Sequence, residues 1–88
     1  MELKDTVEMM TSSDYKERFK AEYFQLKERY ERLKHFCNKI EASWSGKVEE
    51  PKHDCPIELL RDQQKHMGEY LHDLEVRAII EGIDLKGE

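Results

Sequence analysis

Apolar residues recur along the first half of the chain with the spacing of a helix that packs on another helix. Between residues 14 and 45 they follow in alternating steps of four and three, and neither Gly nor Pro interrupts the segment. This first stripe consists of Phe19, Tyr23, Leu26, Tyr30, Leu33, Cys37, Ile40 and Trp44. Such a heptad-like repeat predicts one long helix over 14–45. Asp14 and Glu17 have the spacing of a capping box at its start, and Phe24 and Phe36 lie off the stripe, where they widen the apolar face or contact a second subunit.

The second half of the chain carries a similar stripe after a break. Gly46 and Pro51 interrupt the pattern, so residues 46–55 are expected to form a loop. The second stripe consists of Ile57, Leu60, Gln64, Met67, Leu71, Leu74 and Ala78. It predicts a helix over 56–82 with Pro56 in the first turn, Asp54 or Cys55 as the N-cap and Gly82 at the end.

Two long helices joined by one loop predict an all-α fold, an antiparallel helical hairpin over 14–82. Residues 1–13 are expected to form an extension or a short helix, and residues 83–88 a C-terminal tail into which Ile83 and Leu85 fold back. A layer of two helices leaves one side of its apolar face in water. Self-association into a helical bundle, as a dimer or a higher homo-oligomer, is therefore expected.

Composition and charge exclude several classes of function. Charged residues make up 40% of the 88 residues and the net charge is −5, with a mean hydropathy of −0.93. An acidic total argues against general nucleic-acid binding, and no apolar run approaches the roughly 20 residues of a membrane span. The acidic start MELKDTVEMM lacks the apolar core of a secretion signal, so a cytosolic protein is expected. Residues 14–45, with eight Lys and Arg against six Asp and Glu, could still hold a small anion.

The sequence contains no recognisable catalytic or metal-binding motif. His35 with Cys37 and His53 with Cys55 repeat a His-x-Cys pair, which could suggest zinc. On a helix, however, residues two apart point roughly 200° away from each other, so free thiols are expected instead. There is no phosphate-binding glycine loop, and no serine has an evident base partner. The expectation is a protein that is not an enzyme and needs neither metal nor cofactor.

Gln64 is the one polar residue within the second stripe. A buried glutamine needs hydrogen-bond partners, because an unsatisfied amide costs about 1–3 kcal/mol. Three interpretations remain open. Gln64 fixes the register or the oligomeric state, or the helices separate there and leave it partly exposed. In the third, it lines a ligand cavity between subunits together with Gln63.

The third interpretation defines a candidate ligand site. Amides donate and accept, as a nucleobase edge requires, and tyrosine rings can stack on a base. Basic side chains near them supply charge for phosphate. The predicted ligand-binding residues are Gln63, Gln64, Tyr30 and Tyr70 for base and sugar, with Arg61, Lys27 and Arg29 for phosphate.

Two segments resemble a family of very small phage and prophage proteins described as crAss-phage-related. The likeness covers roughly residues 12–85. Its specific parts are Tyr15-Lys16-Glu17-Arg18, the segments 26–30 and 55–60, Gln63, Met67-Gly68 and the segment 74–78. The extension MELKDTVEMMT and the acidic loop GKVEEPKHD depart from that pattern. The resemblance implies a phage origin and expression in the cytoplasm of a bacterial host.

In size and layout the chain is also similar to small helical phage proteins that oligomerise and sequester cyclic nucleotides, the anti-CBASS and anti-Thoeris sponges. This likeness implies an anti-defence protein that sequesters a nucleotide-derived signal, a cyclic nucleotide or an ADP-ribose derivative, at a subunit interface. One alternative is an acidic module that docks on a host defence protein through Phe24, Phe36 and Trp44. Another is a structural or regulatory helical partner without any ligand.

Overall fold

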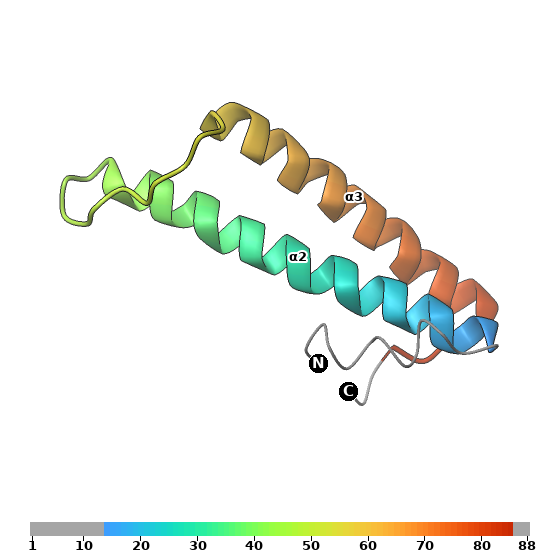
Figure 1. The fold of residues 1–88 in the computed structure, drawn as a ribbon. Coiled ribbons are helices and arrows are strands. Elements are labelled where there is room, and N and C mark those ends of the chain that lie inside the picture. The colour runs from blue at the N-terminus through green and yellow to red at the C-terminus, as the bar shows by residue number, and fades with distance from the viewer. Residues whose placement is uncertain (1–13, 86–88) are drawn as a thin grey trace.

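The protein is a hairpin of two long antiparallel helices, as predicted from the heptad-like stripes (Figure 1). The computed structural model describes residues 14–85, with helix α2 at Tyr15–Ser43 and helix α3 at Ile57–Glu81. The expected extension or short helix at 1–13 lies outside the described residues. Neither helix is long and apolar enough to cross a membrane, as far as residues 14–85 are concerned.

Helix α2 begins at a side-chain cap and ends before a glycine. The Asp14 carboxylate accepts a hydrogen bond from the Lys16 amide at 2.9 Å, which satisfies one of the free N–H groups at the helix start. At the other end, Gly46 has a φ of 80°, a conformation in which L-residues with a Cβ are strained. The helix itself ends at Ser43 with Trp44 as its C-cap, two residues before the predicted end at 45, and Gly46 lies in the turn that follows.

Helix α3 begins one residue later than expected. The N-cap is Pro56, with extended backbone and no side-chain cap, so the assignment of Asp54 or Cys55 to this position is wrong. The Pro56 carbonyl accepts from the amides of Leu59 and Leu60, and proline suits the position because the amide it lacks would have no partner there.

The end of α3 folds the tail back on the hairpin. Gly82 adopts the left-handed conformation with a φ of 70°, and the Ile83 amide donates to the Ala78 carbonyl at 2.8 Å. These are features of a Schellman-type helix end. The turn places Ile83 in the core, and Leu85 packs against the same cluster, as the sequence predicted.

The main core lies at the end of the hairpin opposite the connecting loop. Its buried members are Phe19, Tyr23, Phe24, Leu71, Leu74, Ala78 and Ile83. Phe24 thus widens the apolar face within one chain. At the loop end, Cys37 and Ile40 form a second buried site, whereas Leu33 and Met67 between the two sites are only half-buried. The middle of the hairpin is therefore less completely buried than the two sites on either side of it.

Polar bonds tie one flank of the hairpin together. The Tyr70 hydroxyl donates to Glu22 at 2.9 Å, and Arg77 donates both to the Tyr15 hydroxyl at 2.6 Å and to Glu81 at 3.1 Å. The first two of these bonds join α2 to α3. We call this side of the molecule the tied flank.

Candidate functional site

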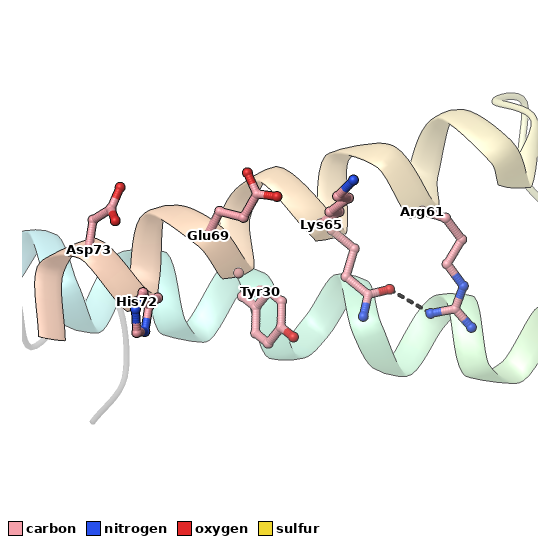
Figure 2. Close-up of a pocket in the computed structure, with 8 residues that line it drawn as sticks. Tyr30, Arg61, Lys65, Glu69, His72 and Asp73 are labelled. Carbon is pink, nitrogen blue, oxygen red and sulfur yellow. Dashed lines mark hydrogen bonds between the residues drawn. The ribbon is translucent and has the colours of Figure 1, made fainter. Parts of the chain in front are cut away.

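The opposite flank of the hairpin carries an open groove between the two helices. Its largest part has a volume of about 690 Å³ (Figure 2). The lining residues are Tyr30 of α2 and Arg61, Gln64, Lys65, Gly68, Glu69, His72 and Asp73 of α3. The groove therefore lies beside the half-buried middle of the hairpin.

Two smaller hollows continue the groove towards the main core. The first, of about 250 Å³, shares Tyr30 and Gly68 with the largest part and is also lined by Lys27. The second, of about 410 Å³, shares Tyr23, Lys27 and Glu75 with the first. Because neighbouring hollows share lining residues, they form one continuous groove along the flank.

Interhelical hydrogen bonds lie on both sides of the largest part of the groove. On the core side, the Tyr23 hydroxyl donates to Glu75 at 3.1 Å, where the two smaller hollows meet. At the loop end, the Arg61 guanidinium donates to Glu41 and, at 3.3 Å, to the Asn38 side chain. Between these two links the groove has no bridging bond among the residues described, so this stretch is open to a ligand.

Tyr30 forms the aromatic wall of the groove and depends on Gly68. A Cβ placed on Gly68 would lie 3.2 Å from the Tyr30 Cε1 atom and 3.5 Å from its hydroxyl oxygen. Glycine in a helix interior costs up to about 1 kcal/mol relative to alanine. At position 68 it lets the tyrosine ring approach the backbone of α3. Within residues 14–85 the Tyr30 hydroxyl has no hydrogen-bond partner, which leaves it available to a ligand.

Arg61 and Gln64 are linked to each other at the loop end of the groove. The Gln64 Oε1 atom accepts from an Arg61 Nη atom at 2.5 Å (Figure 2). The amide is therefore half-buried and satisfied by a cation, while its NH₂ group remains a donor. Because Glu41 already pairs with Arg61, a phosphate at this position has to compete with a carboxylate.

Charges of both signs line the outer edge of the groove. Lys65, Glu69 and Asp73 follow one another at intervals of four on α3, and Figure 2 shows all three pointing away from α2. Together with His72, they make no ion pair with any other residue in the described part of the chain. The groove thus offers uncommitted donors at one end and uncommitted acceptors at the other.

The structure brings three of the seven predicted ligand-binding residues together. Tyr30, Arg61 and Gln64 line the largest part of the groove. Lys27 lines the two adjoining hollows and lies with its ammonium 5.9 Å from the centre of the Tyr23 ring.

The other three predicted residues lie outside the groove. Tyr70 belongs to the tied flank, where its hydrogen bond to Glu22 raises the pKa of its phenol. Gln63 and Arg29 are exposed and line none of the three hollows. Arg29 is two residues from Lys27, so the two side chains point roughly 200° apart on the helix.

Sequence reasoning missed five residues that line the largest part of the groove: Lys65, Gly68, Glu69, His72 and Asp73. Gly68 gave a usable signal, because a glycine within an otherwise regular helical pattern often marks close packing or a functional site. The charged residues gave none, since they have the composition of an ordinary helix surface.

The three aromatic residues proposed as anchors for docking on a host protein differ in their exposure. Phe24 is buried in the core, so that assignment is wrong, and Phe36 is half-buried with its ring 6.2 Å from that of His53. Only Trp44, with 66% of its surface exposed, is available in the way the hypothesis requires. A docking surface built on these three aromatic residues is therefore not what the hairpin presents.

The two thiols and the histidines do not form a metal site in the structure as described. Cys37 is buried, Cys55 is exposed, and both are free. No group of three or more His, Cys, Asp or Glu side chains among residues 14–85 is arranged to hold a metal ion. The chemistry that the groove displays is that of hydrogen bonding, aromatic contact and charge.

Comparison with known proteins gives one match. The model of a family described as Sequestin matches residues 13–80, which is most of the chain and includes both helices almost to the end of α3. No curated protein and no solved structure matches the chain. The family's name denotes sequestration and thus agrees with the likeness to sequestering proteins; it does not speak to a crAss-phage-related origin.

Proposed function

The chain belongs to the Sequestin family, and from this premise we propose that it is a phage anti-defence protein that sequesters a nucleotide-derived immune signal in the cytoplasm of the bacterial host. The signal is a cyclic nucleotide or an ADP-ribose derivative, bound in the groove at a subunit interface. The protein binds it without catalysis and without a cofactor. Sequestration lowers the free concentration of the signal, so host effectors are not activated.

The observation that supports this proposal is the groove around Tyr30. An uncommitted phenol, set against the backbone at Gly68, lies between an amide and two cationic side chains on one side and two carboxylates on the other. Base stacking on an aromatic residue contributes about 1–3 kcal/mol per base. The arrangement offers one group for each part of a nucleotide.

Each part of the nucleotide has a proposed partner in the groove. Tyr30 stacks on the base, and the free NH₂ group of Gln64 donates to an acceptor on its edge. Lys65 and Arg61 hold phosphate, for which charge-assisted hydrogen bonds are the strongest contacts. Glu69 and Asp73, which point away from α2, accept from ribose hydroxyl groups at the outer edge of the groove. Lys27 extends the cationic surface into the adjoining hollow.

The proposal is tested by calorimetric titration and native mass spectrometry with a panel of cyclic dinucleotides, cyclic trinucleotides and ADP-ribose derivatives. Wild-type protein is expected to bind at least one of them stoichiometrically. Tyr30→Ala is expected to weaken that binding about tenfold or more, since 1.4 kcal/mol corresponds to tenfold. The bound molecule, released by denaturation, is expected to be unchanged in mass, because no chemistry occurs.

The neighbouring glutamines provide a matched control. Gln64 lines the groove and Gln63 does not, although both are amides on the same helix. Gln64→Ala should weaken binding several-fold through the loss of a hydrogen bond of about 1 kcal/mol, and Gln63→Ala should leave it unchanged. Equal effects of the two substitutions, or no binding anywhere in the panel, would count against the groove as the ligand site.

A further inference from the structure

Helix α3 carries a second regular row of residues, directed away from the hairpin core. It follows heptad-like steps of four and three, as the core stripe does, but every member is exposed. We call it the outer seam, and it consists of Glu58, Asp62, Lys65, Glu69, His72, Val76 and Ile79. Spacing of this kind keeps one face of a helix in line with a neighbouring helix over several turns.

The outer seam has no partner within the hairpin. None of its charged members forms an ion pair with another described residue, and Ile79 and Val76 are 82% and 41% exposed. By contrast, the tied flank of the same helix is joined to α2 through Tyr70 and Arg77. The tied flank therefore stabilises the hairpin, whereas the outer seam makes no comparable contact within it.

The central charges of the outer seam are complementary to those of a second, antiparallel copy. A twofold axis beside residue 67 places Lys65 of one copy opposite Glu69 of the other, which joins opposite charges, and places Asp62 opposite the His72 ring, which can donate a hydrogen bond to it. By symmetry each pairing occurs twice, as in any interface that uses the same surface on both subunits. We propose that two copies of this protein associate antiparallel through the outer seams of α3.

Such a contact would cover two parts of the surface, the apolar end of the outer seam and the open side of the groove. Val76 and Ile79 lie beyond the charged section, so the antiparallel arrangement carries them to the start of α3 in the partner, with Val76 beside Glu58 and Ile79 beside Cys55. Lys65, Glu69 and His72 belong both to the seam and to the groove lining. A second α3 along the seam therefore covers the open side of the groove and brings side chains of both copies to it.

The role of this contact in covering the groove rests on the proposed function. Its formation, however, can be tested without any ligand. Oppositely charged single variants supply the test. Lys65→Glu sets a new carboxylate opposite Glu69 of the other copy, and Glu69→Lys sets a new ammonium opposite Lys65 of the other copy. Symmetry repeats the repulsion at two places in each case. Each variant alone is expected to weaken the dimer about tenfold or more, because like charges in contact across an interface are strongly unfavourable.

Mixing the two variants distinguishes a contact between copies from an effect within one helix. In a mixed dimer both pairings again join opposite charges, so an equimolar mixture is expected to regain association. An explanation based on the Lys65–Glu69 pair within one helix predicts no such recovery. Sedimentation velocity and native mass spectrometry measure the association, and circular dichroism verifies that each variant is folded.

Lys39→Glu is the matched control, since it makes the same charge change at an exposed position of α2 away from the seam. It is expected to associate as the wild type does, and added salt is expected to weaken the wild-type dimer. A wild-type protein that stays monomeric at millimolar concentration, single variants that associate normally, or a mixture that stays dissociated would each overturn the inference.

Ligand binding separates the fate of this inference from that of the proposed function. Lys65 and Glu69 are themselves assigned to the nucleotide, so their variants are measured for association only and the wild-type protein is used for this comparison. If the wild-type protein binds a nucleotide stoichiometrically while it stays monomeric, sequestration stands and the covered groove is rejected. If the dimer forms as described and no nucleotide binds, the contact stands and the proposed function fails.

Discussion

The most informative single residue in the groove is Gly68. Its missing Cβ allows the Tyr30 ring to lie against α3, and a methyl group at this position would meet the ring edge at 3.2 Å. Such a distance requires the tyrosine to move by a few tenths of an ångström. Because the Tyr30 ring is only half-buried, it can move outwards to make room for the methyl group. The fold can then stay intact while the position of the ring in the groove changes.

Gly68→Ala is therefore expected to change stability and binding in opposite directions. Alanine is favoured over glycine within a helix by about 1 kcal/mol, so the free energy of unfolding should rise by up to that amount or stay level. Ligand affinity should fall several-fold, because the Tyr30 ring no longer occupies its place. Thermal denaturation and calorimetry measure the two quantities, and undiminished affinity would show that this close approach has no role in binding.

At the residue scale the sequence predicted only some of the groove residues. Periodicity shows which side of each helix faces the core, but not the arrangement of the two flanks beside it. Tyr30, Arg61 and Gln64 were found because they lie on or beside the core stripe. The sequence pattern does not show which flank of a two-helix layer is closed. Tyr70 was misplaced for this reason, since its partner Glu22 lies 48 positions away in the chain and no local pattern links them.

The connecting loop is held by a histidine placed between two acceptors. One ring nitrogen of His53 lies 2.6 Å from the Cys55 carbonyl oxygen and the other 3.1 Å from Glu50. A neutral imidazole has only one N–H, whereas the protonated ring donates to both. The carbonyl of Cys55, then Glu50, therefore raises the pKa of His53 above its ordinary value near 6.5, and the nearby Asp54 charge adds to the effect.

This loop is expected to be more stable in mild acid. Because the folded state raises the pKa, the contribution of His53 is complete below about pH 6.5 and disappears as the pH rises through the higher folded value. NMR titration should give a His53 pKa above 6.5, and protease cleavage in the loop should accelerate as the pH is raised. His53→Gln should remove this pH dependence, and a His53 pKa at or below 6.5 would contradict the assignment.

At the scale of the elements, periodicity and helix-end chemistry were good guides. The alternating steps of three and four identified both helices, and Gly82 ends α3 with the expected left-handed backbone. The start of α3 was misjudged because Asp54 and Cys55 looked like better caps than Pro56. Proline lacks the amide that a cap would have to satisfy, so the helix begins there without a side-chain cap.

At the scale of the whole molecule, packing is uneven along the hairpin. The main core, built around Leu74 and Phe19, lies at one end, and only the small buried site of Cys37 and Ile40 stabilises the other. The groove occupies the half-buried stretch between them. Binding sites are commonly found in such regions of low local stability, where a ligand can order what the fold leaves loose.

Hydrogen exchange is expected to follow this gradient. Backbone amides in Leu71–Ala78 and Phe19–Phe24 should exchange most slowly, and those in the first turns of α3 fastest within that helix. A bound nucleotide should slow exchange chiefly around residues 61–73, the stretch that contains the α3 residues lining the largest part of the groove. Mass spectrometry of peptic fragments measures both patterns, and uniform protection along α3 would contradict the uneven packing.

The contrast between the two cysteines has a practical consequence. The thiol of Cys37 has no exposed surface, whereas that of Cys55 lies in solvent near the start of α3. An alkylating reagent reaches Cys55 at once but reaches Cys37 only when the loop end of the hairpin opens. The rate at which Cys37 is alkylated, compared with that of Cys55, thus reports how often the loop end of the hairpin opens. No label has to be introduced into the chain for this measurement.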